Sequence, residues 1–371
     1  MQVHPRIAII GGGPGGLTLA RILHVNGVAA TVFEAETAPD ARRQGGSLDL
    51  HTESGLLALE AAGLTAEFNR VARPEDQFVR LYDKDGRRVF DDEDQTHDGR
   101  PEIDRAQLRA LLLRSLPEGT VRWNRKVRAV KPAGNTWQID LNQGSGGIFD
   151  LVVGADGTWS RVRPLLSDEK PAHTGVTFIE LNIVDAAHRH PELSNLVGRG
   201  KIFALGDSKA LIAQRNSGDK IHVYLVLGNT DIDLSRPVEA RQYLAAQLSG
   251  WSSDLLAFIH AAGDTIAVRA IHALPVGFRW DHKPGVTLIG DAAHVMSPFA
   301  GEGVNNAMLD AAELAKAVLQ PDWRTAVLAF EDAMFARIPE SATQSAYAMA
   351  QFLAPNGLAN AIAIFTGFTV I

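Results

Sequence analysis

The stretch "RIAIIGGGPGGLTLARIL", residues 6–23, sets the fold of this chain. An apolar run of strand length, residues 6–10, leads directly into a glycine cluster, and a segment with helical spacing follows without an ordinary loop. A second apolar run, "AATVFE" at residues 29–34, completes a strand–helix–strand unit. The spacing Gly11-x-Gly13-x-x-Gly16, directly after a strand and at the start of a helix, is typical of a dinucleotide-binding turn.

The glycines of this turn have separate physical tasks. Gly11 permits a tight turn, Gly13 lets the backbone approach a pyrophosphate, and Gly16 allows the helix to pack closely on the sheet. The anion is expected at the helix N-terminus, beside Pro14 and Gly15, where unpaired N–H groups and the helix dipole favour negative charge.

A carboxylate at the end of the second strand strengthens this interpretation. Glu34 follows Gly11 by 23 residues and is placed to accept hydrogen bonds from ribose hydroxyls. Leu17, Ala20 and Leu23 are expected on the buried face of the helix. A glycine turn without a ligand is the alternative, but strand, spacing and acid together favour a dinucleotide site. They do not distinguish NAD from FAD.

Composition narrows the class of protein. With 371 residues, the chain is long enough for two intimately packed domains, and a net charge of -7 gives no electrostatic footprint for nucleic acid. The absence of cysteine excludes disulfides, thiolate catalysis and sulfur-based zinc sites, and it fits a reducing cytoplasm, where we expect the protein. The start of the chain lacks a signal-peptide pattern, and the apolar segment 358–371, with 14 residues, is too short to cross a bilayer. We interpret that segment as packed, either over the active site or against a partner chain, and expect a monomer.

The order of the strand and helix patterns predicts an α/β fold with interleaved domains. Strands are expected at residues 6–10, 29–34, 149–156 and 285–294, an antiparallel sheet within 202–227, and helices at 104–115, 239–249, 303–319 and 322–353. The predicted nucleotide-binding domain is discontinuous and takes residues 1–72, 97–173 and 283–320. A sheet domain for substrate takes residues 73–96 and 174–282, and a C-terminal bridging helix takes 321–371.

A second pair of motifs lies near the end of the predicted nucleotide-binding domain. "GDAAH" places Asp291 at the carboxyl end of a buried strand, where open α/β sheets hold their ligands and where it can accept from sugar-alcohol hydroxyls. In "PFAGEGVNN", Gly301 and Gly303 leave space for a ring system and expose N–H groups at a helix start. A plain turn before a helix is the alternative.

The motifs together resemble one enzyme family. "EIDRAQLRALLL" (102–113), "LVVGADGTWSRVRP" (151–164) and "VTLIGDAAHVMSPFAGEGVNNAMLDAAELA" (286–315), with the opening turn, are similar to the group A flavoprotein monooxygenases, the FAD-dependent aromatic hydroxylases. Within that group, "GGSLDLHTESGLLALEAAGL" (45–64) and "PEIDRAQLR" (101–109) resemble the tetracycline-inactivating enzymes. The resemblance implies a Rossmann-like FAD-binding domain of the glutathione-reductase type, with FAD bound non-covalently.

The resemblance also implies cofactor contacts. Arg105 and Asp49 match positions beside the flavin, Asp156 matches a motif shared between FAD and NADPH, and Arg42 matches a position implicated in NADPH contact, although a solvated loop is an equal alternative for Arg42. The C-terminal FAD contacts implied are Asp291, Pro298, Gly301, Gly303, Val304 and Asn305. Family members often place an arginine directly after the ribose-binding acid, whereas this chain has Ala35, so an adenine-side contact is missing.

The reaction implied is hydroxylation of a phenolic or enolic polycyclic compound, tetracycline being one candidate. NADPH reduces FAD, and O2 then forms a flavin C4a-hydroperoxide that transfers oxygen, so the cofactor carries the chemistry and no catalytic side chain is assigned. The substrate contacts implied are Glu180, Lys201, Phe203, His222, Pro298, Phe299, Gly301 and Met349. Members that act on tetracyclines carry glutamine and arginine in place of Glu180 and Lys201, which changes the charge and hydrogen-bond geometry offered to a substrate.

Several alternatives stay open at this point. The same flavin chemistry could act on a simple aromatic acid or a secondary metabolite, and the chain could instead be an FAD oxidase or a binding protein. His222 on a predicted strand is as compatible with a structural role as with a site. The histidines of "HRH" (188–190) lack a third ligand nearby, so no metal is assigned.

Overall fold

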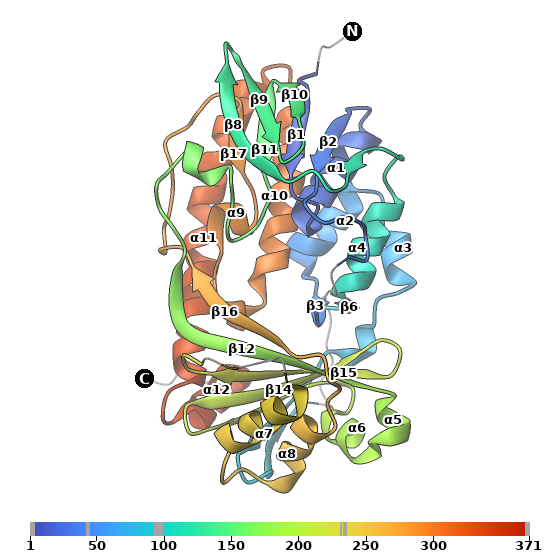
Figure 1. Ribbon diagram of the computed structural model, residues 1–371, viewed down its shortest axis with the longest axis vertical. Helices are drawn as coiled ribbons and strands as arrows, with labels where there is room; N and C mark the ends of the chain where they lie inside the picture. Colours follow the sequence, from blue (N-terminus) through green and yellow to red (C-terminus); the bar gives the residue numbers. More distant parts are fainter. Residues whose placement is uncertain (1–3, 42–44, 93–98, 231, 233–235, 368–371) are drawn as a thin grey trace.

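The computed structural model describes residues 4–41, 45–92, 99–230, 232 and 236–367. A parallel sheet with the strand order β17-β11-β1-β2-β7 forms the centre of the upper body in Figure 1. Its strands are β1 (Ile7–Ile10), β2 (Ala30–Phe33), β7 (Val121–Arg122), β11 (Leu151–Gly154) and β17 (Val286–Leu288). All residues of β1, β11 and β17 are buried, as expected for parallel strands covered on both faces.

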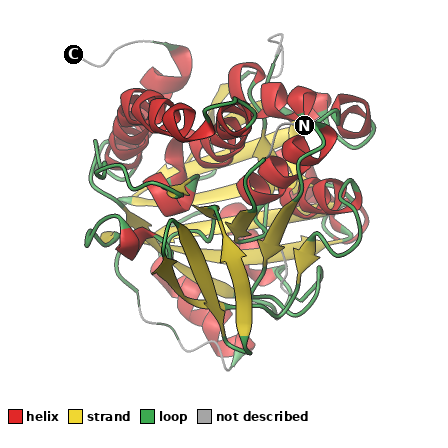
Figure 2. Cartoon of the chain, turned by 90° about the horizontal axis from the view of Figure 1, so that it is seen from above, coloured by secondary structure: helices red, strands yellow, loops and turns green. Residues whose placement is uncertain are grey.

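Helices cover this sheet on one side, and a small antiparallel sheet covers the other. Figure 2 shows many of the helices of the chain gathered on one side of the strands. The helices are α1 (Pro14–Val25), η1 (Thr52–Leu56), α2 (Leu57–Ala61), α3 (Thr65–Asn69), α4 (Arg105–Arg114), η3 (Arg163–Leu165), α9 (Asp291–His294), η4 (Pro298–Ala300) and α10 (Glu302–Val318). The small sheet has the order β10-β9-β8 and consists of β8 (Val127–Ala133), β9 (Thr136–Leu141) and β10 (Ser145–Phe149).

The lower body in Figure 1 is a wide, mostly antiparallel sheet with the order β16-β12-β15-β14-β13-β4-β5. Its strands are β4 (Phe78–Asp83), β5 (Arg88–Asp91), β12 (Ala172–Val184), β13 (Gly200–Gly206), β14 (Lys209–Asn216), β15 (Lys220–Leu227) and β16 (Ala267–Ala273). Its outer face is covered by α5 (Ala186–Arg189), α6 (Pro191–Val197), α7 (Pro237–Gln247) and α8 (Ser253–His260). The short η2 (Pro74–Asp76) leads into β4.

Two links connect the bodies. The pair β3 (Ser47–Asp49) and β6 (Glu102–Asp104) lies between them, and α11 (Trp323–Phe352) runs along both before α12 (Gly357–Thr366) packs on β13 and β4. Because β4 and β5 join the wide sheet while the elements before and after them do not, the chain crosses between the bodies repeatedly. The interleaved α/β fold is therefore confirmed, and the domain boundaries given above stay a prediction.

The element predictions were mostly confirmed, with one correction. The helix predicted over 322–353 is α11, and the residues expected on the buried face of α1, Leu17, Ala20 and Leu23, are at most 2% exposed. The predicted strand 285–294 is wrong beyond residue 288, because Gly290 adopts a positive φ of 59° and the backbone then turns into α9. Among the described residues, no helix is both long and apolar enough to cross a membrane.

Candidate active site

The glycine turn forms as its sequence predicts. A Cβ on Gly11 would lie 2.3 Å from the Ala155 carbonyl oxygen, and one on Gly16 would lie 2.2 Å from the Gly11 oxygen. Both positions therefore have room only for glycine. Gly13, in contrast, has nothing within 4 Å of a Cβ and precedes Pro14 at the open N-terminus of α1. The turn is thus tight on the inside and open toward the place where an anion would bind.

Glu34 closes the turn from the side of β2. Its Oε2 accepts a 2.7 Å hydrogen bond from the Gly12 N–H, and its Oε1 accepts one of 2.9 Å from the Glu36 N–H. These bonds fix the carboxylate next to the turn, at the position expected for a ribose contact. Gly15 faces α10 rather than the ligand side, because a Cβ there would lie 2.9 Å from the Ala307 oxygen.

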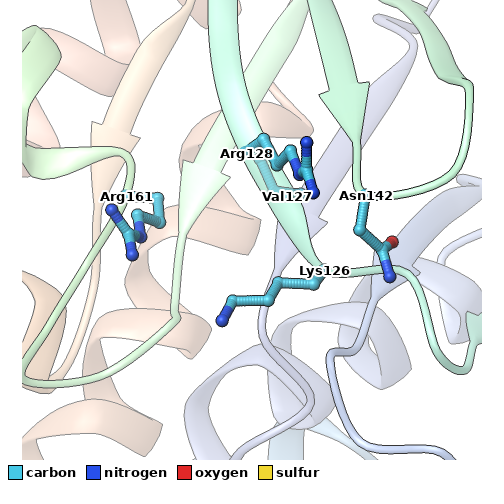
Figure 3. Close-up of a pocket in the computed structure, with 5 residues that line it drawn as sticks. All are labelled: Lys126, Val127, Arg128, Asn142 and Arg161. Atoms are coloured by element: carbon cyan, nitrogen blue, oxygen red, sulfur yellow. The ribbon is translucent and has the colours of Figure 1, made fainter.

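A depression lies beside the turn. It has a volume of about 250 Å³, and Figure 3 shows the residues that line it, Lys126, Val127, Arg128, Asn142 and Arg161. The Arg161 N–H donates to Asp156 Oδ2 at 2.7 Å, and the Arg125 N–H donates to the Glu34 carbonyl oxygen at 2.8 Å. One wall of the depression is therefore attached to the loop after β11, at Asp156, and the other lies next to Glu34 at the end of β2.

Asp156 is held by the loop that follows it. Burial raises the pKa of this carboxyl group, and its Oδ1 has no hydrogen-bond partner among the described residues. The neighbouring Gly157 has a φ of 80° and open space around it. An unpartnered carboxylate oxygen beside open space fits a contact with a bound hydroxyl or N–H group.

Asp291 lies at the other end of the site, at the start of α9. Its side chain is solvent-accessible, yet protein surrounds it so closely that desolvation raises the pKa of the carboxyl group. These two properties fit together if the side chain faces an internal space. Gly303, at the start of α10, has nothing within 4 Å of a Cβ, so its position is open as well.

Asn305 has a role that differs from the ligand contact implied by sequence. Its Oδ1 accepts from the His51 N–H and its Nδ2 donates to the Asp49 carbonyl oxygen, both at 2.9 Å. The carboxamide thus ties β3 to the first turn of α10. Asp49 itself lies next to Gly301, since a Cβ on that glycine would be 3.3 Å from Asp49 Oδ1. Val304 contributes its side chain partly to the core.

Arg105 connects this region with the wide sheet. The residue is exposed, and its backbone N–H donates to the Gly46 oxygen at 3.1 Å. Its positive charge favours the ionised forms of both Asp291 and Tyr224. Because Asp291 belongs to the upper body and Tyr224 to the wide sheet, Arg105 lies between the two. Arg42, the other arginine implied in cofactor binding, lies outside the described residues.

The substrate residues implied on the sheet share one face, because directly opposed residues of neighbouring strands point the same way. Two cross-strand rows contain them, Glu180–Tyr224–Ile212–Phe203 and Asn182–His222–Gln214–Lys201. The opposite face packs on the outer helices, so this face is turned toward the upper body. The structure therefore brings these four residues together on one wall.

The charged members of this wall are paired within the protein. Glu180 forms an ion pair with Arg269, and Lys201 Nζ lies 3.2 Å from Glu102 Oε1. His222 Nδ1 lies 2.8 Å from Asn182 Oδ1, and burial lowers its pKa to about 4, which keeps the imidazole neutral at physiological pH. The wall thus offers polar groups but little unpaired charge.

An aromatic cluster forms the remaining side of the space. Phe299 of η4 contacts Phe178 of β12 and Phe352 of α11, with ring centroids 5.7 and 5.9 Å apart. Phe203 contacts Phe352 at 5.8 Å. Met349 packs at the edge of this cluster, and Pro298 beside it is exposed. The predicted residues Phe203, Pro298, Phe299 and Met349 therefore border an apolar region next to Gly301.

Sequence reasoning missed several residues of the site. Tyr224, Arg269, Glu102 and Phe352 contribute to its walls, but only the pairing of distant strands and helices brings them there. The alternation of apolar and polar residues in β14 and β15 was the only signal for the inward-facing positions.

Comparison with known proteins identifies the family. A family described as "FAD binding domain" matches residues 5–322, which include both glycine motifs and the sheet between them. The chain belongs to the group A flavin monooxygenases. It is 33% identical to "Monooxygenase penA" of Penicillium thymicola, over 89% of this chain and 88% of that protein.

Solved structures of flavin monooxygenases have the same fold. The "HpxO" structure from Klebsiella pneumoniae in complex with FAD and uric acid has a TM-score of 0.83, is 19% identical, and covers 99% of this chain and 93% of its own. The tetracycline destructase Tet(51) has a TM-score of 0.74 and 18% identity, and covers 99% of this chain and 97% of its own. This flavin monooxygenase therefore has the fold predicted from its motifs.

Proposed function

We propose that this flavin monooxygenase uses NADPH and O2 to hydroxylate a phenolic or enolic polycyclic compound, with tetracycline as one candidate substrate. The observation that supports this best is the set of groups beside the accessible Asp291: the open position at Gly303, the paired polar wall of the wide sheet and the aromatic cluster at the edge of that wall. Polar groups of this kind beside aromatic side chains suit a flat aromatic molecule next to a flavin.

The residues present fit FAD at both ends. Gly13 and the first turn of α1 would hold the pyrophosphate, Glu34 the ribose, and Asp291 the hydroxyls of the ribityl chain. The adenine would lie toward the depression in Figure 3, where the planes of Arg128 and Arg161 can stack on it. These two arginines would replace the adenine-side contact of the arginine that family members often carry after the ribose-binding acid, where this chain has Ala35.

When bound, FAD accepts a hydride from the nicotinamide and activates O2 for insertion into the substrate. The protein's contribution is to bind, orient and exclude water. Arg105 and the N-terminus of α10 would favour negative charge on the reduced ring system. The aromatic cluster of Phe178, Phe299 and Phe352 would keep the reacting carbon away from solvent.

The residues on the wall of the wide sheet favour a substrate whose group facing them is polar but uncharged. Because Glu180 is paired with Arg269 and Lys201 with Glu102, a substrate carboxylate would meet no unpaired cation from these four residues. His222, held neutral by burial, could accept a hydrogen bond from a phenol or enol at Nε2. This favours a phenolic or enolic group at that edge over an acid.

A small heteroaromatic substrate is the second candidate. It is supported by the HpxO structure with FAD and uric acid, which matches this chain over nearly its full length. Such a substrate would use the same wall but fill less of the apolar region next to Phe299 and Met349.

A substrate panel measured by NADPH oxidation tests the proposal. The purified protein should be yellow, and its NADPH consumption should rise with a substrate whose product gains the mass of one oxygen atom. Stimulated NADPH consumption with hydrogen peroxide as the sole product would instead indicate an oxidase. FAD binding without any NADPH consumption would indicate a binding protein.

A further inference from the structure

A buried histidine with carboxylates on both sides lies next to the site but has no task in the function proposed above. His51 follows β3 and is 0% exposed. Its Nε2 lies 3.3 Å from Asp49 Oδ2, and its Nδ1 lies 3.6 Å from Glu302 Oε1 and 3.9 Å from Glu53 Oε1. Nδ1 has no hydrogen-bond partner among the described residues.

The row of side chains runs from the site to the surface. Asp49 is its inner end, because it lies beside Gly301, where we place the flavin. Glu53 is its outer end, with 72% of its side chain exposed. The imidazole of His51 stands between Asp49 on one side and Glu53 and the partly buried Glu302 on the other.

The surrounding charges decide which carboxyl group of the row holds a proton at rest. Desolvation opposes the ionisation of Asp49, but Lys201 and His51 outweigh it and hold the pKa of Asp49 below its usual range. For Glu302, desolvation exceeds the opposing effects of His51 and Arg100 and raises the pKa. The resting proton therefore stays on Glu302, the weaker acid, whereas Asp49, the stronger acid, readily passes on any proton that reaches it.

The spacing of the row is fixed by Asn305. Its carboxamide accepts from the His51 N–H and donates to the Asp49 carbonyl oxygen, and Asn305 is itself 0% exposed. The same side chain donates to the Gly301 oxygen at 3.3 Å. The backbone around Asp49 and His51 is thus held at a constant distance from the helix that carries Glu302.

We propose that Glu302, His51 and Asp49 form a proton relay from the surface at Glu53 to the cofactor site. The inference rests on the proposed function, because hydroxylation consumes one proton: substrate–H, O2, NADPH and H⁺ give substrate–OH, NADP⁺ and water. A site that excludes water needs another source for that proton. The relay supplies it without opening the site to solvent.

The transfer balances atom by atom. The O–H bond of protonated Glu302 breaks as the N–H bond at His51 Nδ1 forms, and the Nε2–H bond breaks as an O–H bond forms on Asp49. Asp49 then gives its proton to the acceptor in the cofactor site, and Glu302, whose side chain is 21% exposed, takes a new proton from solvent beside Glu53. Rotation of the imidazole restores the starting tautomer.

The test measures proton uptake by the FAD-loaded protein, apart from turnover. Bound FAD is reduced anaerobically by a light pulse with electrons from a sacrificial donor such as EDTA, and the proton taken up from solution is followed with a pH-indicator dye against a control without protein. We expect His51→Gln and Glu302→Gln to slow this uptake about tenfold or more. Glu60→Gln, on the exposed side of α2, should leave it unchanged and serves as the matched control.

Two further readouts separate a relay from a structural role. The solvent isotope effect and the pH profile of the O2-dependent step should both change in the His51→Gln and Glu302→Gln variants. Anaerobic reduction of FAD by NADPH should keep its wild-type rate in both, because hydride transfer takes no proton from solution.

Wild-type proton uptake in both variants would overturn the relay and leave the monooxygenase proposal intact. Failure of the wild-type protein to bind FAD or to accept electrons from NADPH would instead overturn the proposed function. If the His51→Gln variant does not bind FAD, the relay is judged from proton uptake in Glu302→Gln alone, because that variant keeps the imidazole.

Discussion

At the scale of single residues, two glycines of the turn are needed for different reasons: Gly16 for the packing of the fold and Gly13 for room for the ligand. Gly16 has the Gly11 oxygen 2.2 Å from its would-be Cβ, whereas Gly13 has nothing within 4 Å. Gly13 also has an extended backbone, with φ -79° and ψ 178°, which any residue can adopt. A methyl group at Gly13 therefore meets no protein atom, only the place assigned to the pyrophosphate.

This contrast gives a first prediction. Gly13→Ala should change the free energy of unfolding of the apoprotein by less than about 0.5 kcal/mol. It should weaken FAD binding about tenfold, which corresponds to about 1.4 kcal/mol. Gly16→Ala should destabilise the apoprotein by about 1–3 kcal/mol because the backbone must move. Thermal unfolding and titration with FAD check both, and a Gly13→Ala variant that binds FAD normally would contradict the placement of the pyrophosphate.

His222 gives a prediction about pH. Burial lowers its pKa to about 4, whereas a histidine in an unfolded chain titrates near 6.5. Between these values the unfolded state binds more protons, so this group removes stability as pH falls from 6.5 toward 4. The loss from His222 alone between pH 7.5 and pH 5 should be about 2 kcal/mol.

The measurement compares His222→Gln with the wild-type protein in thermal unfolding at both pH values. The variant should lose less stability on acidification than the wild type does. Equal losses in the two proteins would show that folding does not lower the pKa of His222.

Residue roles were predictable where one local motif defines them and not where distant residues meet. The turn glycines and Glu34 follow from spacing within one strand–helix–strand unit. The pairing of Lys201 with Glu102 depends on β13 and β6 meeting in space, and spacing along the chain carries no trace of it. For the same reason the use of the Asn305 carboxamide on β3 was missed.

At the scale of elements, the short helix α9 depends on one buried carboxylate. Asp310 of α10 accepts from the Gly290 N–H at 2.9 Å and lies 2.6 Å from His294 Nε2 and 2.8 Å from Arg337. Desolvation opposes its ionisation, but His294, Arg337 and the Gly290 N–H outweigh it and lower the pKa of Asp310. Asp310 of α10 thus holds the turn at Gly290 that positions Asp291.

Asp310→Asn should therefore destabilise the protein by about 3–5 kcal/mol, because it leaves the Arg337 guanidinium without its buried carboxylate partner. It should also weaken FAD binding in the protein that remains folded. Glu313→Gln, which removes a half-buried carboxylate on the same Arg337, is the control and should cost less than about 1 kcal/mol. Similar effects of the two substitutions in thermal unfolding would refute this role of Asp310.

Elements with strong periodicity or a strong motif were the predictable ones. The α11 helix was predicted through Pro339, although proline usually ends a helix, because the flanking pattern continues on both sides. The strands β8 to β10 were not predicted, since short solvated strands lack a clear apolar alternation. The end of β17 was placed too late because burial continues through the turn into α9.

At the scale of the whole molecule, the wide sheet separates two different cores. Phe258 of α8 is buried against the outer face, and Phe352 of α11 is buried on the face that borders the proposed substrate space. The two phenylalanines are thus comparable in burial but differ in their distance from the proposed chemistry.

Phe352→Leu and Phe258→Leu should each lower the free energy of unfolding by about 1–2 kcal/mol. Only Phe352→Leu should raise the share of NADPH oxidation that ends as hydrogen peroxide, because it loosens the wall that excludes water. Peroxide measured against product in both variants checks this. An equal rise in both would mean that general destabilisation, not the aromatic wall, controls the coupling.

The central claim is that one FAD molecule extends from the turn at Gly13 to the carboxylate of Asp291, and titration of the apoprotein with FAD tests it most directly. We predict one bound FAD per chain, and a dissociation constant that rises about tenfold or more in both Gly13→Ala and Asp291→Ala. Binding in both variants as tight as in the wild-type protein would contradict it.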